Sequence, residues 1–172
     1  HLAELEDAEL QELYVMLGEI RRKEGDAEAA IEALQRVVDY DADHSEALEG
    51  LAKLYQQTER WEQAIDVTRQ LLDADDDDPA MRFTRWTRIG DMCAEHTDNP
   101  TRAIEAYQSA LEAKPGSVAV LRKLLEIYKT TEQWHAAVDV LAELVDIQEE
   151  PTRRAKFLYT TAIIQRDKME DV

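Results

Sequence analysis

Thr131-Glu132-Gln133-Trp134 lies 73 residues after a near copy of itself, Thr58-Glu59-Arg60-Trp61. The agreement extends upstream, because Tyr55 stands the same distance before Tyr128. Within this long period the hydrophobic pattern divides again, at roughly 34 to 39 residues, which is the length of a helix pair. The sequence therefore predicts an array of structural repeats.

Composition favours helices over strands. Of the 172 residues, 44% are hydrophobic and 34% are charged, and only five are Gly and four are Pro. A β fold would need more turn residues. No apolar run approaches the roughly 18 residues that span a bilayer, so we expect no membrane insertion and a cytoplasmic location.

The net charge of −18 is unevenly distributed. Residues 1–78 carry 23 acids and 7 bases, whereas residues 79–172 carry 15 acids and 13 bases. The acidic part disfavours nucleic acid and anionic lipid as partners. The excess acid is interpreted as a solubilising surface, with selection for a basic partner as the alternative.

Turn and capping residues divide the chain into helices. Gly25 ends the first helix, Asp26 is expected to cap the second, and Asp43 with Glu46 resembles a capping box. Hydrophobic positions three and four residues apart fill the segments between the breaks. The expected helices are about 7–23, 27–40, 45–57, 60–74, 79–96, 100–113, 118–130, 134–148 and 152–169.

Apolar residues of each helix are expected to face a neighbouring helix. In the first helix they include Leu10, Leu13, Tyr14 and Leu17. Stripes of this width cannot stay exposed, so helix pairs must stack on one another.

Four in-phase motifs resemble the tetratricopeptide repeat family. The clearest reads Trp86-x2-Ile89-Gly90-x2-Cys93, followed by Ala103-x3-Tyr107 and Pro115. The others begin at Tyr14, Leu48 and Leu121, with small residues at most of the expected helix crossings. Leu125 departs from the pattern, because it replaces a small residue, so the fourth pair is expected to sit slightly apart.

The resemblance implies an all-α, right-handed superhelical solenoid of antiparallel helix pairs. It would form one domain, with repeats at about 7–44, 45–78, 79–117 and 118–150 and an unpaired terminal helix at 151–172. Alternating long and short repeats resemble the arrays of bacterial multi-repeat proteins, which implies that the chain is part of a longer protein.

In this family the first helix of each pair lines a concave groove that binds partners. A matching register gives a set of mixed charge here: Glu19, Arg22, Glu49, Lys53, Gln56, Thr87, Arg88, Asp91, Arg122, Glu126 and Lys129. Such a groove suits an extended peptide or a helix. The alternative for any one of these residues is an ordinary solvated helix face.

No catalytic, cofactor or metal motif occurs. The run Asp73–Asp78 lacks the Gly and the distal Glu of a calcium loop, so it is interpreted as a turn with a helix cap. The four His residues lack metal-ligand spacing, and Cys93 falls on a core face.

The sequence therefore predicts a non-catalytic scaffold that binds a protein or peptide. Two alternatives remain open. One is a structural spacer that self-associates through its open terminal helix, and the other is the regulatory repeat region of a larger enzyme or signalling protein.

Overall fold

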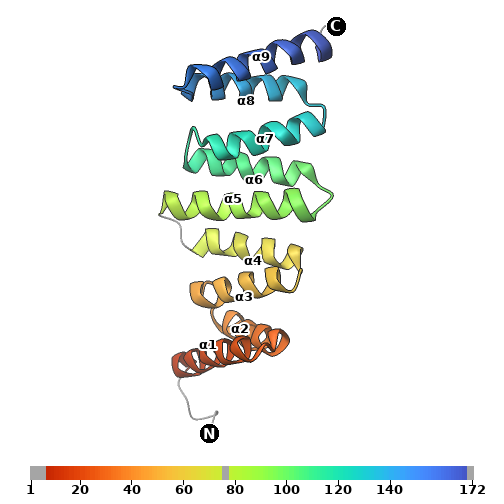
Figure 1. Ribbon diagram of the computed structural model, residues 1–172. Coiled ribbons are helices and arrows are strands. Elements are labelled where there is room, and N and C mark those ends of the chain that lie inside the picture. The colour runs from red at the N-terminus through yellow and green to blue at the C-terminus, as the bar shows by residue number, and fades with distance from the viewer. Residues whose placement is uncertain (1–6, 75–77, 170–172) are drawn as a thin grey trace. The chain divides into compact units, whose positions relative to one another are not determined.

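The computed structural model describes residues 7–74 and 78–169, which form nine α-helices and no strand (Figure 1). Every predicted helix is present within two residues of its expected ends. The helices are α1 (Asp7–Glu24), α2 (Ala27–Tyr40), α3 (Ser45–Gln57), α4 (Trp61–Ala74), α5 (Pro79–His96), α6 (Pro100–Ala113), α7 (Val118–Thr130), α8 (Trp134–Ile147) and α9 (Pro151–Lys168).

The repeated Thr-Glu stretches form the same turn twice. Glu59 and Glu132 both adopt a left-handed backbone, each with φ of 57°. The hydroxyls of Thr58 and Thr131 donate to the carbonyl four residues earlier, at 2.9 and 2.8 Å. Each turn reverses the chain between two helices of a pair, so the sequence repeat reflects a repeated structural unit.

Helix caps explain where several helices begin. Asp26 and Asn99 accept hydrogen bonds from backbone N–H groups three residues on, at 3.1 and 3.3 Å, and Glu150 caps α9 through Thr152. The prediction for α3 was wrong. His44, not Asp43, is the N-cap, and its Nδ1 accepts from the Ala47 amide at 3.3 Å. Neutral imidazole offers an acceptor nitrogen, which the capping-box pattern does not anticipate.

Contacts group the chain into two compact units, His1–Asp78 and Pro79–Val172. The first contains the pairs α1–α2 and α3–α4, and α2 also packs on α3. The second contains α5–α6, α7–α8 and the additional helix α9, with further packing of α6 on α7 and of α8 on α9. In each pair the two helices run antiparallel (Figure 1). We call α1, α3, α5, α7 and α9 the first helices and the others the second helices.

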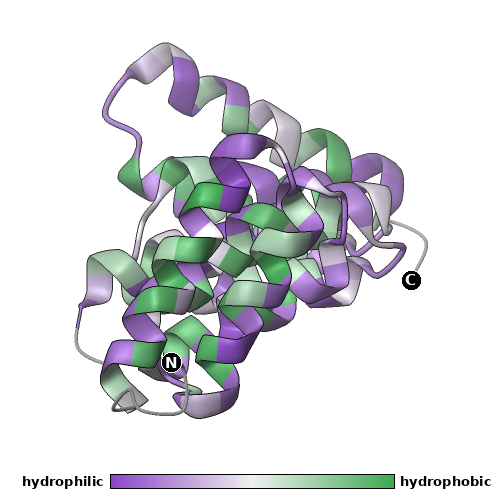
Figure 2. Cartoon of the chain, turned by 90° about the horizontal axis from the view of Figure 1, so that it is seen from below, coloured by the Kyte–Doolittle hydropathy of each residue, from purple (hydrophilic) through white to green (hydrophobic). Residues whose placement is uncertain are grey.

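Apolar side chains are buried in each unit. Hydrophobic and hydrophilic residues alternate along the helices (Figure 2). Small residues mark the crossing points, as predicted. Ala30, Ala64, Ala103 and Ala137 are all fully buried. Gly90 is the tightest crossing, because a Cβ there would lie only 2.5 Å from the Tyr107 ring.

The fourth pair is packed less closely, as the Leu125 side chain predicts. The α7–α8 and α3–α4 pairs have the same helix lengths. The backbones of α7 and α8 nevertheless come close at fewer positions. Leu125 is buried, with 7% of its surface exposed.

The outer face of α1 differs from the prediction. Leu13 and Leu17 were expected in the core, but they are 44% and 38% exposed. Met16 and Ile20 beside them are 55% and 53% exposed. The reason is geometric: α2 covers the Gly18 side of α1, and no second described helix of the first unit lies against its other apolar side.

Candidate functional site

The predicted groove residues of the first unit pair with one another along their own helices. Arg22 contacts Glu19 at 2.8 Å on α1, and Lys53 lies 3.7 Å from Glu49 on α3. The hydrogen bond from Arg22 is the main cause that holds the pKa of Glu19 below its usual value, and Lys53 of the neighbouring first helix adds to it. In the first unit, therefore, the surface has mixed charge that is largely compensated internally.

In the second unit Asp91 is committed to the packing of three helices. Its carboxylate accepts from the Tyr107 hydroxyl at 2.6 Å and forms an ion pair with Lys123. Burial, followed by this hydrogen bond, strongly raises the pKa of Tyr107. The Lys123 ammonium also lies 5.7 Å over the Tyr107 ring. Asp91 therefore joins α5, α6 and α7, and a ligand would have to displace Lys123 to reach it.

The α7 residues of the set lie on an exposed wall. Lys129 binds Glu126 at 3.0 Å. Arg122 instead lies over the Phe157 ring of α9, with 5.9 Å between its guanidinium carbon and the ring centroid. In the described part of the chain, no carboxylate lies within ion-pair distance of Arg88 or Arg122. The charges of Arg88 on α5 and Arg122 on α7 are therefore not compensated by a described carboxylate.

A shallow pocket of about 340 Å³ lies between these helices. Its lining includes both partners of Asp91, Tyr107 and Lys123, together with residues of the α7 wall. The full lining is Ala94, Glu95, Tyr107, Arg122, Lys123, Glu126 and Ile127. Arg122 and Glu126 are the predicted residues that the pocket brings together. Sequence reasoning missed Lys123 and Phe157. The signal for Lys123 was its place three residues before Glu126, which puts the two side chains on one face of α7.

Two of the predicted groove residues have polar atoms that a ligand cannot reach. The amide nitrogen of Gln56 and the hydroxyl of Thr87 are buried, and neither has a hydrogen-bond partner among the described residues. A partner could use them only after a local rearrangement. The polar groups of Arg122, Glu126 and Lys129, by contrast, are accessible in the second unit.

No group of His, Cys, Asp and Glu able to hold a metal ion occurs in residues 7–74 and 78–169. The described helices include none with the length and apolar character to cross a membrane. Cys93 is 1% exposed, as expected for a packed thiol. The Asp75–Asp77 part of the predicted acidic turn lies outside the described residues.

Residues 21–82 match the sequence model of the Tetratricopeptide repeat family. This segment therefore resembles tetratricopeptide repeats. The matched segment covers α2, α3 and α4, and the same motifs recur through α8. No curated protein matches the sequence.

Solved structures give the same fold class over nearly the whole chain. The crystal structure of MamA protein is 19% identical, with a TM-score of 0.62, and the match covers 95% of this chain and 96% of that one. YrrB, described as a TPR protein with an unusual peptide-binding site, is 15% identical, with a TM-score of 0.57 and coverage of 92% and 77%. Naa15/Naa10 bound to HypK-THB matches at 15% identity and a TM-score of 0.57, covering 91% of this chain and 22% of that one. The chain therefore has the fold of an all-α helical-repeat superhelix.

Proposed function

We propose that this protein is a non-catalytic scaffold that binds an extended segment of another protein along its first helices. The observation that carries the proposal is Arg122, which Phe157 positions at the edge of the α5–α7 pocket and which has no carboxylate partner among the described residues. An arginine held on an aromatic ring is oriented in advance, so less conformational entropy is lost when a carboxylate binds.

Charge selects the kind of segment. Glu126 and Lys129 already satisfy each other, and Asp91 is held by Lys123. Arg88 and Arg122 remain to receive negative groups. We infer that the bound segment carries one or two carboxylates beside apolar residues that fill the pocket. YrrB gives general support, because that chain has the same fold and is described as having a peptide-binding site.

The test is affinity capture from a lysate of the source organism. Wild type is compared with Lys53→Glu/Arg122→Glu, which reverses one groove charge in each unit. A matched control, Arg36→Glu/Arg69→Glu, makes the same change in net charge on the second helices α2 and α4. We expect a protein that wild type and the control retain and the groove variant loses. Equal capture by all three proteins would place the binding surface elsewhere and contradict the proposal.

A further inference from the structure

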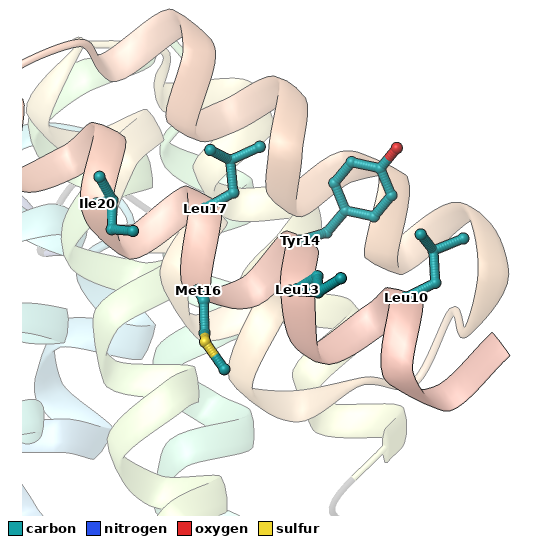
Figure 3. Close-up of a pocket in the computed structure, with 6 residues that line it drawn as sticks. All are labelled: Leu10, Leu13, Tyr14, Met16, Leu17 and Ile20. Atoms are coloured by element: carbon teal, nitrogen blue, oxygen red, sulfur yellow. The ribbon is translucent and has the colours of Figure 1, made fainter. Parts of the chain in front are cut away.

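Among the described helices, α1 has the most large apolar side chains that are exposed. Leu10, Leu13, Tyr14, Met16, Leu17 and Ile20 line a shallow pocket of about 390 Å³ (Figure 3). Four of these side chains are more than one-third exposed. Apolar patches of this kind on a protein surface mark interaction sites. We call Leu13, Met16, Leu17 and Ile20 the α1 stripe.

The chain's own repeat shows what covers such a stripe. Helices α1, α5 and α9 each have 18 residues and begin 72 residues apart. The α1 stripe therefore corresponds to Phe157, Thr160, Thr161 and Ile164 on α9. In α9 these four positions are buried or half-buried, and α9 packs against α8. The face that α1 exposes is thus the face that α9 places against an amphipathic helix.

The charges around the stripe differ from those on α9. Lys168 follows Ile164 by one turn, and its ammonium lies 5.3 Å over the Trp134 ring of α8. The corresponding residue of α1 is an acid, Glu24, which is ion-paired with Arg21 at 3.0 Å. A second acid, Glu9, lies one turn before Leu13. The surrounding segment, residues 1–78, has an excess of 16 acids over bases. A helix seated here would meet negative charge near the start of the stripe, at Glu9, and in the surrounding segment.

We propose that the α1 stripe docks a basic amphipathic helix of a partner protein. The helix would lie as α8 lies on α9, with three or four apolar side chains against the stripe and lysine or arginine near Glu9. Apolar contact would supply most of the affinity, and the opposite charges would select the partner and its orientation.

The probe is a synthetic peptide with the Trp134–Ile147 sequence in which the exposed residues Asp139, Glu143 and Asp146 are replaced by lysine. The unmodified peptide, which keeps the three acids, is the matched control. Binding of each labelled peptide to the full chain is followed by fluorescence anisotropy. We expect the lysine peptide to bind at least about tenfold more tightly, and added salt to weaken it.

The site is located with the chain variant Met16→Gln/Ile20→Gln. Both residues are more than half exposed, so the helix content and melting temperature should stay unchanged. Binding should fall by at least about tenfold. Leu158→Gln/Tyr159→Gln, which alters exposed apolar residues of α9, should leave binding unchanged.

Three results would overturn the proposal. One is binding that persists in Met16→Gln/Ile20→Gln, because the peptide would then occupy another place, such as that of α8. Another is equal binding or no binding of the two peptides. The last is sedimentation showing that the chain alone self-associates and that the stripe variant does not, since a second copy would then be the occupant.

Discussion

Replacing Gly90 with alanine should destabilise the second unit, although alanine is the better helix former. Alanine in a helix interior gains about 1 kcal/mol over glycine. The new Cβ would lie 2.5 and 2.6 Å from two carbons of the Tyr107 ring. Overpacking of a core typically costs about 1–3 kcal/mol.

The Tyr107 ring has little freedom to move away. It is 2% exposed, and its hydroxyl is fixed to Asp91 at 2.6 Å. The upper part of the overpacking range therefore applies, and we expect a net loss of about 2 kcal/mol after the gain in helix propensity.

Gly50→Ala is the matched control. A Cβ at Gly50 would approach the terminal Cδ1 of Leu34 at 2.6 Å, while the next atoms lie 3.8 Å away. Because the end of a leucine can rotate, we expect the stability to stay within about 1 kcal/mol of wild type. Urea unfolding followed by circular dichroism and tryptophan fluorescence measures both variants.

A double-mutant cycle locates the cause. In a Tyr107→Leu background the ring is gone, so Gly90→Ala should destabilise the chain much less than it does in wild type. If Gly90→Ala proved as stable as Gly50→Ala, or kept its full cost without the ring, the account of this crossing would be wrong.

Trp86→Ala should lower the free energy of unfolding by about 2–4 kcal/mol. This is slightly less than the loss expected for a fully buried tryptophan, because the Trp86 ring is only partly covered. A change below about 0.5 kcal/mol in urea unfolding would contradict the repeat register. The pKa of Glu150 is lowered, chiefly by its hydrogen bond with Thr152, so this cap stabilises α9 above the usual carboxyl pKa and loses its effect as the pH falls through the lowered value. The stability difference between wild type and Glu150→Ala should therefore shrink on acidification. A difference that grows as the pH falls would contradict this reasoning. Burial raises the pKa of Tyr107, so the folded chain holds that proton, and the stability it provides is lost as the pH rises above about 10, where an unfolded tyrosine ionises. The stability of Tyr107→Phe relative to wild type should therefore rise with pH in alkaline urea unfolding. A stability difference that does not change with pH would contradict this.

The helices were predictable from the sequence because their ends carry strong local signals. Gly25, Asn99-Pro100 and the two Thr-Glu turns each restrict the backbone directly. The cap of α3 was not predictable, because histidine rarely serves as an N-cap and Asp43 stood next to it.

Tertiary contacts were less accessible to sequence reasoning. The spacing of Leu13 and Leu17 shows that α1 has an apolar face, but not which helix covers it. Exposed apolar surface was expected at the terminal helix, where Leu158 and Tyr159 are indeed exposed, yet the larger patch is on α1. Likewise, Asp91 was predicted as a groove residue, and only the structure shows that Lys123 and Tyr107 already engage it.

The groove assignment itself remains a proposal, and the charge pairs explain why. Glu19 with Arg22 and Glu126 with Lys129 look like ligand-binding groups in a sequence, although pairs at this spacing also satisfy each other on any solvated helix. Arg122 stands out only after Phe157 is seen beneath it.

Site-specific photo-crosslinking tests the central claim, binding along the first helices, most directly. A benzophenone side chain is placed at Ala94, an exposed residue of α5 in the pocket lining, and in a separate protein at Ala142, an exposed residue of α8. Each is irradiated with the captured partner. The account predicts a crosslink from position 94 that Arg122→Glu abolishes, and none from position 142. A crosslink from position 142 alone would show that the partner binds the second helices, and the central claim would be wrong.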